Sequence, residues 1–145
     1  MRELPRQLSA EQLAELFEGR TRFVERLAAV EDPLGRAREV ARRLDDDEKK
    51  EVLDAHPAIG AKATSERSQR EQGTDDDPAV LAELTRLNRA YEDKFGFRFV
   101  VFVNRRPRRE LVPILRARIE RTREQELETG VDELVQIAVN RWRTS

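Results

Sequence analysis

The amino-acid sequence predicts an all-α protein, and three observations support this prediction. Apolar residues recur at helical spacing along most of the chain, and Ser and Thr capping boxes precede two of these runs. The composition, 38% hydrophobic and 39% charged, fits amphipathic helices that bury one face and expose the other. The length of 145 residues suits one domain, so we expect a single domain over residues 1–145.

Charge and cysteine content argue against several classes of protein. The 28 Lys and Arg residues balance 29 Asp and Glu residues, so no overall field attracts nucleic acid or anionic lipid. The absence of cysteine excludes disulfides and thiolate metal sites. No stretch has the apolar length of a secretory signal or a membrane span, which predicts a soluble, cytoplasmic protein.

The first three expected helices look like scaffold. A capping box at residues 9–12 predicts a helix that Gly19 ends. Apolar spacing over residues 23–30 predicts a second helix that stops before Pro33, and Pro33 is expected to begin a third that continues to Leu44.

The next helices surround the candidate site. Acidic residues 45–48 suit the start of a helix that Pro57 should break, which places His56 at the helix end or in the following turn. Residues 58–77 contain few apolar side chains and are consistent with a functional loop. Pro78 begins the clearest helix, and Gly96 is expected to end it.

The most hydrophobic stretch, residues 97–103, reads as a strand by composition alone. Because the sequence offers no second strand for it to pair with, we expect an extended segment that passes through a helical core. Two helices should follow, over residues 107–121 and 122–142, and the capping box at residues 122–125 begins the second.

His56 is the only histidine, and it is the only side chain whose ordinary pKa lies near neutrality. A lone His before Pro is more often a helix-terminal residue than a catalyst. Ser68, Glu71 and Gln72 would share one face of a helix, although a solvated polar face is the better explanation of that spacing alone.

Other chemistries find weaker support. One His and no Cys make a zinc site improbable, and no nucleotide-binding glycine motif is present. A Ser-His-acid hydrolase has the necessary residue types but no nucleophile elbow. The arginines of residues 105–109 lack the aromatic platform of a nucleic-acid site, and Arg141 is by default a surface residue, with an anion clamp as the sharper alternative.

Four blocks in order resemble the family of OHCU decarboxylases, which act on 2-oxo-4-hydroxy-4-carboxy-5-ureidoimidazoline (OHCU) and form (S)-allantoin in urate catabolism. The blocks are His56-Pro57-x-x-Gly60-x-Lys62, Ser68-x-x-Glu71-Gln72, the stretch from Leu87 to Phe99, and the tail from Glu126 to Arg141. The resemblance covers residues 9–143. One departure is Arg98, where many family members have proline.

The resemblance implies an all-helical fold, no cofactor and a homodimer with OHCU as substrate. It also implies that His56 is the catalytic proton donor and that Glu71 orients the imidazole. The implied substrate contacts are Pro57, Ser68, Gln69, Arg70, Gln72, Phe99, Val100, Val101, Phe102, Val103 and Arg141. The alternatives are a non-catalytic helical module that binds a small ureido compound or a partner protein, and a nucleic-acid binder that uses residues 105–109.

Overall fold

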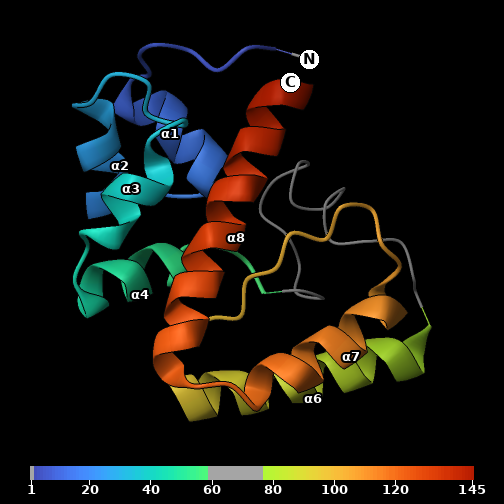
Figure 1. The fold of residues 1–145 in the computed structure, drawn as a ribbon. Helices are drawn as coiled ribbons and strands as arrows, with labels where there is room; N and C mark the ends of the chain where they lie inside the picture. The colour runs from blue at the N-terminus through green and yellow to red at the C-terminus, as the bar shows by residue number, and fades with distance from the viewer. Residues whose placement is uncertain (1, 59–76) are drawn as a thin grey trace.

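The structure, a computed structural model, describes residues 2–58 and 77–145. All regular elements in these residues are helices, as predicted, and Figure 1 shows their arrangement. They are α1 (Ala10–Phe17), α2 (Arg22–Ala28), α3 (Ala37–Arg42), α4 (Asp46–Asp54), α6 (Pro78–Phe95), α7 (Arg108–Ile119) and α8 (Arg123–Thr144).

The long C-terminal helix α8 organises the fold. The helices α1, α3 and α4 pack directly against α8, and α2 packs on α1, α3 and α4. The helices α6 and α7 pack on each other and lie at the opposite end of the molecule from the chain termini in Figure 1. The apolar side chains of all seven helices form one buried cluster, which is the arrangement expected of amphipathic helices.

Helix starts follow the predicted capping chemistry. The side chain of Ser9 accepts a hydrogen bond from the Gln12 N–H, and the Gln12 side chain accepts one from the Ser9 N–H. Thr122 and Gln125 repeat this reciprocal pair at the start of α8. These bonds satisfy backbone donors that have no partner inside the helix.

Two helix boundaries differ from the prediction. Helix α1 ends at Glu18, which takes the left-handed conformation with φ 63°, whereas Gly19 was expected to stop it. A Cβ on Gly19 would lie 3.2 Å from the Ala55 Cβ, so its role is to allow close packing on the end of α4. Helix α3 begins at Ala37, because Pro33 starts a turn and not the helix itself.

Residues 97–103 form the predicted extended segment, and it belongs to no strand in the described chain. Five of its seven residues are buried, and Phe97, Phe99 and Val100 expose 2% or less of their surface. In Figure 1 the segment runs from the end of α6 past the middle of α8 before it reaches α7. The Phe102 N–H donates to the Glu133 carboxylate of α8 at 3.4 Å, which fixes this course.

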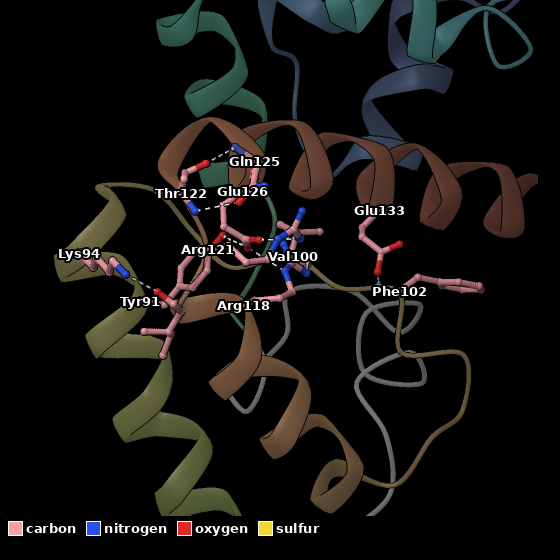
Figure 2. Close-up of polar contacts among 11 residues, drawn as sticks. Tyr91, Lys94, Val100, Phe102, Arg118, Arg121, Thr122, Gln125, Glu126 and Glu133 are labelled. Atoms are coloured by element: carbon pink, nitrogen blue, oxygen red, sulfur yellow. Dashed lines mark hydrogen bonds and ion pairs between the residues drawn. The ribbon is translucent and has the colours of Figure 1, made fainter.

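A buried ionic network also contacts the extended segment of residues 97–103 (Figure 2). The Glu126 carboxylate is fully buried and accepts 2.7 Å hydrogen bonds from the Tyr91 hydroxyl and from Arg118 Nε. A second Arg118 nitrogen donates to the Val100 carbonyl at 2.7 Å, and its guanidinium lies 4.5 Å from the centre of the Phe99 ring. The network therefore ties α6, α7 and α8 to the extended segment.

The second carboxylate oxygen of Glu126 completes the network. It lies 3.0 Å from the Arg121 guanidinium, close enough for an ion pair although not aligned as a hydrogen bond. Burial and the neighbouring carboxylate both raise the pKa of Tyr91, so the phenol stays protonated and can donate. No pattern in the sequence predicts that Tyr91, Arg118 and Glu126 meet.

Candidate functional site

His56 lies in the turn that follows α4, where the sequence placed it. Helix α4 ends at Asp54 with Ala55 as its cap, and the His56 N–H donates to the Leu53 carbonyl at 3.2 Å. The side chain is only partly exposed, and its Nδ1 atom is buried with no hydrogen-bond partner among the described residues. A buried ring nitrogen of this kind is available to a ligand.

Arg141 of α8 faces the same turn. Its side chain is 1% exposed, and its guanidinium donates to the Leu16 carbonyl at 2.8 Å and pairs with the Glu18 carboxylate at 3.1 Å. The default expectation of a surface arginine is therefore wrong, because Arg141 is a buried charge with a buried counterion. Glu18 is 9% exposed and was not predicted.

In the sequence Glu18 is marked only by its negative charge at a helix end, and the structure adds a second unfavourable feature. A carboxylate at a helix C-terminus opposes the helix dipole, and a residue other than glycine rarely adopts the left-handed conformation. Two unfavourable features at one position indicate that a specific partner compensates them. That partner is the guanidinium of Arg141.

The surroundings keep the imidazole of His56 neutral at neutral pH. The pKa of His56 is lowered to about 4, mainly by burial and also by the positive charges of Arg141 and Arg98, while Glu18 acts in the opposite direction. An imidazole with this pKa carries one N–H donor and one acceptor nitrogen in the resting protein. It can accept a proton from a ligand and then return it.

Several predicted site residues lie outside the described chain. These are Ser68, Gln69, Arg70, Glu71 and Gln72, so their placement relative to His56 stays a prediction. Pro57, which directly follows His56, is half-buried. The structure thus brings together His56, Pro57 and Arg141 of the predicted set, and adds Glu18.

The predicted backbone contacts at residues 99–103 are partly engaged by the protein itself. The Val100 carbonyl accepts from Arg118, and the Phe102 N–H donates to Glu133. The carbonyls of Phe102 and Val103 accept from Arg106 at 2.5 and 2.9 Å. The Phe99 ring packs edge-on against Tyr91 at 5.2 Å, inside the core. Their contact with substrate remains a prediction.

A separate surface hollow of about 590 Å³ lies over Leu4, Arg6, Glu31, Asp32 and Arg36. None of the predicted site residues lines it. It is open to solvent, and within it the carboxylate of Glu31 pairs with Arg6. The candidate site is therefore the His56 turn and not this hollow.

The low pKa of His56 predicts a pH dependence of stability that a His56→Asn variant should lack. The ordinary histidine pKa is about 6.5, so between about pH 4 and 6.5 the unfolded chain binds more protons than the folded chain. Stability should therefore fall as the pH falls through this window, by up to about 1.4 kcal/mol per pH unit and about 3 kcal/mol in total.

Urea unfolding of both proteins at several pH values between 4 and 7.5 measures this effect. The carboxylates common to both chains cancel in the difference between the two free energies of unfolding. The free energy of unfolding of the parental protein minus that of the His56→Asn variant should decrease steadily as the pH falls. Parallel curves would show that the imidazole is not buried.

The fold and this turn define an all-helical protein with one half-buried, neutral imidazole next to a buried Arg-Glu pair. The family description OHCU decarboxylase matches residues 2–143 of the chain. The protein belongs to the OHCU decarboxylase family, which confirms the resemblance seen in the sequence. None of the helices in residues 2–58 and 77–145 is long and apolar enough to cross a membrane.

Relatives with assigned activities are similar along much of the chain. Identity is 30% over 112 residues, or 71% of the chain, to the "Uric acid degradation bifunctional protein" of Bacillus sp. (strain TB-90). It is 34% over 96 residues, or 63% of the chain, to the "2-oxo-4-hydroxy-4-carboxy-5-ureidoimidazoline decarboxylase" of Halalkalicoccus jeotgali. The match covers 22% of the first relative's length and 54% of the second's.

Solved structures share the fold. A crystal structure of "OHCU decarboxylase in the presence of (S)-allantoin" superimposes with a TM-score of 0.74 at 26% identity, covering 90% of this chain and 94% of the other. A structure of "(S)-allantoin synthase" gives a TM-score of 0.68 at 24% identity, covering 93% of this chain and 48% of the other, and shows the fold alone.

Proposed function

We propose that this protein decarboxylates OHCU to (S)-allantoin and CO₂, with His56 as the proton donor to carbon. The observation that carries the proposal is the buried Nδ1 of His56, which has no partner among the described residues and lies in a turn next to Arg141. Membership of the OHCU decarboxylase family supplies the substrate class.

The substrate itself can accept the electron pair that decarboxylation releases. Its name places a hydroxyl and a carboxyl group on ring carbon 4 and the ureido group on carbon 5. The ring also contains an imine, a double bond between carbon 5 and a ring nitrogen. When the bond to the carboxylate breaks, its electron pair forms a double bond between carbons 4 and 5, and the π pair of the imine moves to the ring nitrogen. A proton from solvent neutralises that nitrogen. This chemistry explains how a decarboxylase could work without a separate electron sink.

The intermediate then needs one proton moved from oxygen to carbon. The hydroxyl on carbon 4 must become a carbonyl, and carbon 5 must gain a hydrogen on one face. A neutral imidazole can accept the hydroxyl proton and deliver it to the neighbouring carbon, which conserves protons over the two steps. The low pKa of His56 supports this role, because the resting ring is free to accept. Delivery from one side sets the S configuration.

The remaining residues would orient the substrate. Arg141 is a buried guanidinium, and such a group suits an anionic carboxylate or a carbonyl. We assign Glu71 to orienting the imidazole, and substrate contact to Pro57, to residues 68–70 with Gln72, and to residues 99–103. The family blocks contain Pro57, residues 68–72 and Phe99, and residues 100–103 directly follow the third block, which supports the assignment.

We further propose that residues 1–145 form a single domain and that the protein acts as a cytoplasmic homodimer. Support comes from the family resemblance and from a composition without cysteine or a long apolar run. Light scattering after size-exclusion chromatography would give the mass of the assembly. A mass of one chain, 16.9 kDa, at micromolar concentration would contradict the dimer.

The activity test generates OHCU from urate with uricase and hydroxyisourate hydrolase and then adds this protein. Circular dichroism follows the chirality of allantoin as it forms. We expect faster formation of a signal with a single sign than in the mixture without the protein. A slow, racemic product would refute the decarboxylase function, and binding without turnover would favour a non-catalytic module.

A further inference from the structure

The arginine that departs from the family pattern contacts the backbone around His56. One terminal nitrogen of Arg98 donates to the His56 carbonyl at 2.8 Å and lies 3.4 Å from the Asp54 carbonyl. Its Nε donates to the Glu92 carboxylate of α6 at 3.1 Å, and its backbone N–H donates to the Asp54 carboxylate at 3.0 Å. Arg98 thus links the end of α4, the extended segment and α6.

The Arg98 guanidinium contacts carbonyl groups at and just after the C-terminus of α4. The last carbonyls of a helix have no partner inside the helix and carry the negative end of the helix dipole. A guanidinium is planar and delocalised and presents several N–H groups, so one group can bridge two carbonyls and a carboxylate together. In the same turn the His56 N–H donates to the Leu53 carbonyl at 3.2 Å.

We propose that Arg98 is a positioning residue that fixes the His56 turn by clamping the carbonyls of Asp54 and His56 and anchoring on Glu92. The inference rests on the proposed function for its catalytic consequence. A proline at this position offers neither a backbone N–H for Asp54 nor a guanidinium for the two carbonyls. This chain therefore secures the turn by a different contact set from the one that a proline permits.

Charge provides a second way to observe the clamp. The charged groups that act on the imidazole are Arg141 from α8, Glu18 from the end of α1, and Arg98. Arg98 and Arg141 both lower the pKa of His56, whereas Glu18 raises it. Removal of the Arg98 charge should therefore raise this pKa, and replacement by another cation should not.

Two substitutions separate geometry from charge. Arg98→Gln removes the positive charge and the fork of donors, whereas Arg98→Lys keeps the charge and loses the fork. Because His56 is the only histidine, its Cε1–H group gives a single ¹H–¹³C NMR signal that can be titrated without assignment. The control is Arg86→Gln, since Arg86 also pairs with a carboxylate of α6, that of Glu83, and its side chain is more exposed than that of Arg98.

We expect the NMR midpoint of Arg98→Gln to move to higher pH, and the midpoints of Arg98→Lys and Arg86→Gln to stay at the parental value. In the OHCU assay both Arg98 variants should lose roughly 10- to 100-fold in kcat with a small change in KM, because a misplaced acid costs about this much. The Arg86→Gln variant should keep the parental kcat.

Either of two results would overturn the proposal. One is an unchanged His56 midpoint in Arg98→Gln, and the other is a parental kcat in a folded Arg98→Lys variant. The NMR titration needs no turnover, so it tests the contact between Arg98 and His56 even if OHCU is not the substrate. If the parental protein shows no decarboxylation while the midpoint moves as expected, the proposed function fails and the clamp stands.

Discussion

A His56→Asn variant is expected to fold and to lose about 10² to 10⁴ in kcat for OHCU decarboxylation, with loss of the single-handed product. The reason is that the proposed reaction needs one group to take the hydroxyl proton and deliver it to one face of carbon 5. Asparagine retains polarity and similar size but cannot be protonated. The imidazole is half-buried at a helix end, so the fold should tolerate the change.

Measurement combines the coupled assay with far-ultraviolet circular dichroism of the variant. The helical signal should match the parental protein, while the allantoin that forms should be close to racemic. Arg86→Gln serves as the folded, active control. A folded His56→Asn variant with near-parental kcat and a product of single sign would remove His56 from the reaction.

Glu126→Ala is expected to reduce the free energy of unfolding by about 3 to 5 kcal/mol, because it leaves a buried arginine without its counterion. Glu126 is fully buried and is the acceptor for both Arg118 and Tyr91. Its removal would strand the Arg118 guanidinium, which is only 8% exposed and also holds the Val100 carbonyl. Loss of the network should also loosen the extended segment.

Urea unfolding monitored by Trp142 fluorescence and circular dichroism gives the free energy. The control is Glu133→Ala on the same helix, where the carboxylate is only partly buried and accepts one long bond from Phe102. That change should cost about 1 kcal/mol or less. If the two variants were equally stable, the buried network would contribute nothing specific to the fold.

The local elements could be predicted because their signals lie close together in the sequence. Ser9 and Thr122 begin helices through partners three residues away, and Gly96 ends α6 in the left-handed conformation with φ 81°. The exceptions have tertiary causes. Glu18 takes the left-handed conformation beside Gly19 because its carboxylate meets Arg141, which lies more than a hundred positions further along the chain.

The candidate site divides in the same way. The position of His56 after α4 follows from Pro57 and from the helix pattern, and the family blocks name the residues of the site. No local pattern could show that Arg141 is buried with Glu18, or that Arg98 bonds to the backbone of His56. These contacts join segments that are distant in sequence, so they exist only after the helices have packed.

The sequence by itself determined the helical class, most helix starts, the extended course of residues 97–103 and the single imidazole available for proton transfer. Tertiary structure decided the state of that imidazole. Burial and two guanidinium groups from separate segments, Arg98 and Arg141, hold the pKa of His56 at about 4. The physical reason is that capping and periodicity act over a few residues, whereas desolvation and charge pairing depend on which distant segments the fold brings together.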